Sequence, residues 1–157
     1  MPKPIFKKNE LNKIIKDTIN LMKTNDKDIA INFYSNEVYY VNSDIEQLNR
    51  VFINLFKNSI ESLKEKYEKR GFFQKKIDVE IQSINDYINV VVEDNGTGFT
   101  NNNLKTLSKP YFTTKKEGSG LGLSIVEKIL NDHNGFIEFI SQKEAAKIKI
   151  LLPKYVN

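Results

Sequence analysis

Three short stretches of this sequence carry residues that could together bind a nucleoside triphosphate. Asn54 and Asn58 lie one turn apart on a predicted helix, and amide oxygens suit a hard cation such as Mg²⁺. Asp94 follows an alternating apolar run and opens Asp94-Asn95-Gly96-Thr97-Gly98, whose glycines let a ligand approach the backbone. The third stretch, Gly118-Ser119-Gly120-Leu121-Gly122, begins a helical pattern, where free N–H groups favour anions. A carboxylate, metal-binding amides and room for phosphates are what an ATP site needs.

Each of these residues also has a purely structural interpretation. The two asparagines could lie on a solvated helix face, and Asp-Asn-Gly is an ordinary turn sequence. Lys115, which follows Thr113 and Thr114, could be a solvated loop lysine or a cation near the γ-phosphate. The functional interpretation of Asp94 is recognition of the adenine amino group. Guanine presents a carbonyl there, and two facing acceptors cost about 1–3 kcal/mol.

Apolar periodicity predicts the elements that position these stretches. A helical spacing predicts helices over residues 10–24, from the capping box Ser43-x-x-Glu46 to about Lys69, and from Leu121 to near Gly135, the expected C′ glycine. Alternation predicts strands around residues 29–33, 38–41, 77–81, 88–92, 136–141 and 147–152, the second of which returns after a Ser35-Asn36 turn. The predicted buried stripe of the second helix contains Ile45, Leu48, Phe52, Leu55, Ser59 and Leu63.

These elements predict an α+β fold, a two-layer sandwich with three main helices on one face of a mixed, mostly antiparallel sheet. Residues 95–117 show little periodicity, and a loop of that length in a compact domain is typical of a lid over a site. The only histidine, His133, falls at the end of the third predicted helix. A histidine there can bond the last carbonyl groups, so we interpret it as structural rather than as a phosphate acceptor.

Length and composition exclude several classes of protein. A chain of 157 residues, 39% hydrophobic and 28% charged, is typical of one globular domain. It has no apolar run of about eighteen residues that could span a membrane, and without cysteine it has no disulfide or thiolate metal site, which fits a reducing compartment. The net charge of +4 would suit a nucleic-acid binder. The lysines are scattered among acids and no recognition motif is present, so a mixed solvated surface is the better interpretation.

The ordered motifs resemble the N, G1, F and G2 boxes of sensor histidine kinases. In this sequence the boxes are Asn54-x-x-x-Asn58, Asp94-x-Gly96-x-Gly98, Tyr111-Phe112-Thr113-Thr114-Lys115 and Gly118-x-Gly120-Leu121-Gly122-Leu123. The resemblance runs from about Phe6 to Lys154 and implies their catalytic ATP-binding module, of the Bergerat fold shared with gyrase, the Hsp90 chaperones and MutL. Lys109-Pro110 before the F box, and Asn131-Asp132-His133-Asn134-Gly135, most resemble the nitrogen-regulation, NtrY-like branch.

The resemblance implies a role for each motif residue. Asn58 would bind Mg²⁺, Asn54 would support the phosphate end, and Asp94 would read adenine beside Gly96 and Gly98. The ATP-binding residues implied in the lid and the third stretch are Phe112, Thr113, Thr114, Lys115, Gly118, Gly120, Leu121 and Gly122. Asn54 and Lys115 are the catalytic candidates. ATP-hydrolysing relatives carry a glutamate at the position of Asn54, and an asparagine is no general base at neutral pH, so transfer to a protein acceptor fits better than rapid hydrolysis.

The sequence departs from a whole kinase at its start. No histidine and no helical hairpin precede Asn9. We therefore interpret residues 1–9 as the junction to a missing dimerisation and phosphoacceptor domain, residues 10–154 as the catalytic domain, and residues 155–157 as a tail. The resemblance implies a monomeric cytoplasmic fragment of a homodimeric kinase, which can be anchored in the inner membrane and passes phosphate from its histidine to a response regulator. The fragment alone is not expected to phosphorylate itself.

One enzyme of the same superfamily is an alternative. A serine kinase of the anti-sigma-factor type is a compact single domain that binds a partner protein, which would explain the absence of an upstream hairpin. The Tyr111–Lys115 box fits sensor kinases better.

Overall fold

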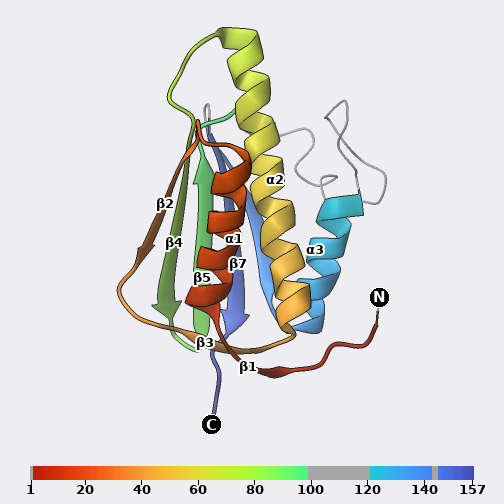
Figure 1. The fold of residues 1–157 in the computed structure, drawn as a ribbon. Coiled ribbons are helices and arrows are strands. Elements are labelled where there is room, and N and C mark those ends of the chain that lie inside the picture. Colours follow the sequence, from red (N-terminus) through yellow and green to blue (C-terminus); the bar gives the residue numbers. More distant parts are fainter. Residues whose placement is uncertain (1, 99–120, 143–144) are drawn as a thin grey trace.

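A computed structural model describes residues 2–98, 121–142 and 145–157 of the chain. In these residues, three helices stand side by side on one face of a five-stranded sheet (Figure 1). The helices are α1 (Leu11–Asn25), α2 (Ile45–Arg70) and α3 (Leu121–Asp132). The strands are β1 (Lys7–Glu10), β2 (Ala30–Ser35), β3 (Tyr40–Ser43), β4 (Lys76–Ile84), β5 (Tyr87–Asp94), β6 (Phe136–Gln142) and β7 (Ala145–Pro153). The predicted α+β sandwich is confirmed.

The large sheet is mixed, with the strand order β2-β4-β5-β7-β6. Only β2 and β4 run parallel, and the other neighbouring pairs are antiparallel. Strand β5 lies in the middle, and its alternate residues Ile88, Val90 and Val92 are buried. Because side chains alternate between the faces of a sheet, these residues define the face that the helices cover.

Helix α2 supplies the centre of the core. It runs between α1 and α3 and packs against both (Figure 1). Phe52, Leu55 and Phe56 are fully buried, and burial of such a side chain contributes about 1.5–3 kcal/mol. The prediction that Ile45 belongs to the buried stripe is wrong, since 48% of this residue is exposed. Ile45 is the first residue of the helix and lies before the part that meets the core, whereas Val51, which was not predicted, is buried.

The expectation that the second strand turns back after β2 is also corrected. Strand β2 pairs with β4, from Ala30 beside Lys76 to Ser35 beside Ile81. Strand β3 pairs instead with β1 in a separate two-stranded sheet. The chain between β2 and β3 is held by the Asn12 side chain, which donates to the Glu37 carbonyl at 2.8 Å. Local alternation identified both strands but could not identify their partners.

The predicted capping box does not start α2. The N-cap residue is Asp44, whose Oδ1 accepts a hydrogen bond from the Gln47 N–H at 3.1 Å. Ser43 belongs to β3, is fully buried, and accepts a bond from Asn9 Nδ2 at 3.1 Å. An aspartate is as good an N-cap as a serine, so the helix begins one residue later than the box predicts.

The end of α3 differs from the prediction by one residue. Asn134, with φ of 57°, adopts the left-handed conformation that the sequence assigns to Gly135. The Gly135 N–H then bonds to the Leu130 carbonyl at 2.7 Å. A Cβ on Gly135 would lie 2.7 Å from the Leu151 carbonyl oxygen, so glycine is needed there for close approach to β7 rather than for its φ.

His133 joins the end of α3 to the start of α2, which confirms a structural role. Its Nδ1 lies 2.8 Å from the Ile129 carbonyl, and its Nε2 accepts from the Asp44 N–H at 3.1 Å. The ring is buried and meets Phe6 edge-on at 5.0 Å. Because Nε2 acts as an acceptor, the ring is neutral. Burial lowers the pKa of His133, against the opposite effects of the Ile129 carbonyl and of Asp44.

This junction predicts a loss of stability in mild acid. The unfolded chain binds a proton on His133 as the pH falls below about 6.5, while the folded chain resists it until its lower pKa is reached. The free energy of unfolding should therefore decrease over that range. In His133→Leu, stability at neutral pH should be lower but this pH dependence should disappear, because the chain has no other histidine. Urea unfolding at about pH 7.5 and about pH 5.5 measures both effects. An equal decrease in the two proteins would contradict the assignment.

Candidate functional site

Asp94 is buried at the end of a ladder of apolar residues. It is the last residue of β5 and follows the register of Val90 and Val92, so its side chain lies on the face that the helices cover. Only 4% of the residue is exposed. A carboxylate is costly there unless it is hydrogen-bonded, and its Oδ1 accepts from the Gly96 N–H at 2.9 Å. The sequence predicts a carboxylate at the end of a strand, and the structure shows that this carboxylate lies on the face covered by the helices.

The turn after Asp94 has no room for a side chain at Gly96. A Cβ at that position would lie 2.3 Å from Ser62 Oγ and 2.8 Å from Asp94 Oδ1. Gly98 has a φ of 78°, in the left-handed region that favours glycine. Both glycines of this stretch are therefore required by the local geometry, one by close approach to α2 and one by its backbone conformation.

Two of the three predicted stretches meet in space. The Thr97 N–H donates to Ser62 Oγ at 3.0 Å, and the hydroxyl groups of Ser62 and Thr97 are 3.1 Å apart. Ser62 lies one turn after Asn58 on α2, so the loop after β5 is fastened to the helix that carries Asn54 and Asn58. Stretches that are separated by about forty residues thus form one surface.

The two asparagines lie on the flank of α2. Asn54 and Asn58 are half-buried, and Gln47 and Val51, which precede them at helical spacing, are buried. They are therefore not on the fully solvated helix face that the structural interpretation assigns to them. Both residues are nevertheless partly exposed, so a ligand can reach them.

The third stretch is described only at its end. Leu121 and Gly122 begin α3, which packs against α2. A Cβ at Gly122 would meet no atom of the described residues within 4 Å. The other predicted site residues of the lid and the third stretch lie outside the described residues: Phe112, Thr113, Thr114, Lys115, Gly118 and Gly120.

Three residues at this surface were missed by sequence reasoning. Ser62 holds the loop after β5 from α2, as described above. Lys66, one turn later, donates to the Asn95 carbonyl at 2.7 Å, and Asn95 bonds the start of β4. The spacing of four residues between Asn58, Ser62 and Lys66 would have indicated one polar face on the helix.

The donor set suits a cation shared with phosphate rather than one held by protein alone. Among residues 2–98, 121–142 and 145–157, no three acidic, histidine or cysteine side chains are grouped to hold a metal ion. Asn58 offers a neutral amide oxygen, and Mg²⁺ commonly combines one or two protein ligands with phosphate oxygens and water.

The same part of the chain has no helix long and apolar enough to cross a membrane.

Known proteins are similar to most of this chain. A family model described as histidine kinase-, DNA gyrase B- and HSP90-like ATPase matches residues 43–156. An NtrY-like sensor histidine kinase of Rickettsia felis is 34% identical over 149 residues, which are 94% of this chain and 24% of that protein. The chain therefore spans about a quarter of the length of this curated relative.

Two solved structures are also similar. The catalytic domain of histidine kinase ThkA has a TM-score of 0.83 and 27% sequence identity, and the similarity covers 96% of this chain and 96% of that chain. Histidine kinase ThkA in complex with the response regulator protein TrrA has a TM-score of 0.77 and 26% identity, and covers 96% of this chain and 42% of that chain.

Proposed function

Because the chain belongs to the histidine kinase-, DNA gyrase B- and HSP90-like ATPase family, we propose that it is the ATP-binding catalytic domain of a sensor histidine kinase. It would transfer the γ-phosphate of ATP to a histidine on a separate domain, from which the phosphate would pass to a response regulator. The relatives named above are histidine kinases, which favours this activity over that of an anti-sigma-factor-type serine kinase.

One observation carries the proposal. The loop with the buried Asp94 is hydrogen-bonded to α2 through Ser62, one turn from Asn58. A carboxylate that can accept from the adenine amino group and amides that can face phosphate and metal thereby share one surface. The base would then lie at the loop after β5 and the phosphates along α2.

The residues of α2 favour phosphoryl transfer over rapid hydrolysis. Mg²⁺, held by Asn58 and phosphate oxygens, would neutralise charge on the phosphates. Asn54 is neutral at all physiological pH values and cannot remove a proton from water. Catalysis would then come mainly from holding the γ-phosphate in line with an acceptor, to which Lys115 in the lid would add a cation.

Partners and location follow from the same proposal. The acceptor histidine would belong to a dimerisation domain of the whole kinase, and the ThkA–TrrA complex supports a response regulator as the next acceptor. The fragment itself would be monomeric. It would lie in the cytoplasm, because it would need both ATP and a response regulator there. Residues 1–9 would be the junction to the dimerisation domain.

Asp94→Asn tests recognition of the base. The variant retains an Oδ1 acceptor for the Gly96 N–H, so the turn should remain folded. Its amide also presents a donor to the adenine amino group, so ATP affinity should fall by about tenfold or more, and discrimination against GTP should decrease. Calorimetric titration with both nucleotides measures this. Asp17→Asn, at an exposed ion pair on α1, is the control. Wild-type ATP affinity in Asp94→Asn would contradict the assignment.

Asn58→Ala tests the metal role. ATP affinity in the presence of Mg²⁺ should fall about tenfold, whereas affinity measured with a chelator should change much less. Asn20→Ala, at an exposed position of α1, controls for the change in helix propensity. Equal losses with and without Mg²⁺ would show that Asn58 acts on the nucleotide and not on the metal.

A further inference from the structure

Asn95, the first residue after β5, is hydrogen-bonded through both its side chain and its backbone, although no role follows from its motif position. Its Oδ1 accepts from the Lys76 N–H at 2.9 Å, and its Nδ2 donates to the Gln74 carbonyl at 2.8 Å. Its backbone N–H donates to the Lys76 carbonyl at 3.3 Å, and its carbonyl accepts from Lys66 Nζ at 2.7 Å. Every donor and acceptor group of this half-buried residue therefore has a partner.

These bonds continue the sheet beyond the last residue of β5. The ladder between β4 and β5 ends with Ile77 beside Asp94. One step further, the side-chain amide of Asn95 bonds one N–H and one carbonyl of the incoming chain, as a backbone peptide would. A serine is too short for this, and an aspartate has no hydrogen with which to donate to the Gln74 carbonyl. Asparagine is thus suited to its place between Asp94 and Gly96.

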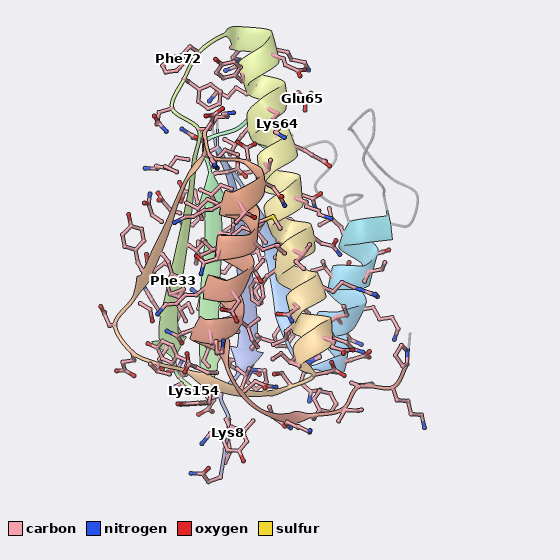
Figure 2. The ribbon with its side chains drawn as sticks, viewed as in Figure 1. Lys8, Phe33, Lys64, Glu65, Phe72 and Lys154 are labelled. Carbon is pink, nitrogen blue, oxygen red and sulfur yellow. The ribbon has the colours of Figure 1, made fainter. Side chains whose placement is uncertain are left out.

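The segment that Asn95 holds comes from the far end of α2. The chain leaves the helix through Gly71, which has a φ of 84°, and passes Phe72, which lies at the end of the molecule opposite the two termini (Figures 1 and 2). Phe72 is 84% exposed, whereas its neighbour Phe73 is partly buried and packs against the core. The bonds from Asn95 and Lys66 add polar attachments to this packing, because they join the start of β4 and the last part of α2 to the Asn95 peptide.

On the basis of the proposed function, we infer that Asn95 is a positioning residue for base recognition. It fixes the peptide units on both sides of it, and the neighbours so fixed are Asp94, which faces the base, and Gly96, whose N–H orients the Asp94 carboxylate. Ser62 holds the same turn from its other side through Thr97. Asn95 would not touch the nucleotide. It would set the direction of the Asp94 carboxylate, and with it the preference for adenine over guanine.

Asn95→Ala separates positioning from simple stability when it is compared with Asn12→Ala. Asn12, at the start of α1, is a buried amide that likewise bonds backbone groups, donating to the Glu37 carbonyl at 2.8 Å and accepting from the Tyr39 N–H at 2.9 Å. Both variants should unfold at lower temperature. Only Asn95→Ala should also lose about tenfold in ATP affinity and lower the ratio of ATP to GTP affinity.

A measurement without nucleotide tests the same inference. Amide hydrogen exchange at Gly96 and Thr97 should be faster in Asn95→Ala than in the wild type and in Asn12→Ala, because the turn has lost its attachment to β4. Wild-type nucleotide affinity, wild-type ATP to GTP ratio and unchanged exchange in Asn95→Ala would overturn the inference, since the residue would then be merely structural.

If Asn95→Ala does not fold, Lys66→Met tests whether the bonds to Asn95 position Asp94. It removes one bond to the Asn95 carbonyl and keeps an apolar stem beside Phe73, over whose ring the Lys66 ammonium lies at 4.8 Å. A loss of ATP affinity of about threefold, with faster exchange at Gly96, would support the inference that the bonds to Asn95 position Asp94. Unchanged affinity and exchange would overturn that inference. A wild-type protein that binds no ATP would instead refute the proposed function, so the two failures are distinguishable.

Discussion

The structure around the site depends on one carboxylate buried at the end of an apolar strand. Asp94 occupies a position where the register of β5 would otherwise place a hydrophobic residue against the helices. Such a group must be hydrogen-bonded, and it is held by a turn that fits only glycine at Gly96. Two hydrogen bonds hold this turn: Ser62 on α2 accepts from the Thr97 N–H, and Asn95 accepts from the Lys76 N–H at the start of β4. Fold and site are therefore linked through a few polar contacts at one end of the sheet.

Much of the architecture could be predicted because it depends on local periodicity. The alternation along β4 and β5 and the helical spacing along α2 correctly identified the elements and the face that they bury. The prediction that Asp94 and Asn58 belong to one site came from the resemblance of the ordered motifs to those of a known family, and it stays a prediction. What they contact could not be inferred from spacing alone.

Two of the errors share a physical cause, which is competition between neighbouring residues of similar propensity. Asp44 and Ser43 are both good N-caps, and the long-range bond from Asn9 to Ser43 favours Asp44 as the cap. Asn134 and Gly135 can both adopt a left-handed conformation, and the approach of Leu151 decides between them. The pairing of β3 with β1 was likewise set by tertiary contacts that no local pattern encodes.

A map of amide chemical-shift changes during titration of the isotope-labelled domain with ATP and Mg²⁺ tests the central claim most directly. The largest changes should fall on α2 between Asn54 and Ser62 and on the loop from Asp94 to Gly98. Changes centred instead on the hollow lined by Asn12, Lys16 and Phe33, with the loop after β5 unaffected, would contradict the account.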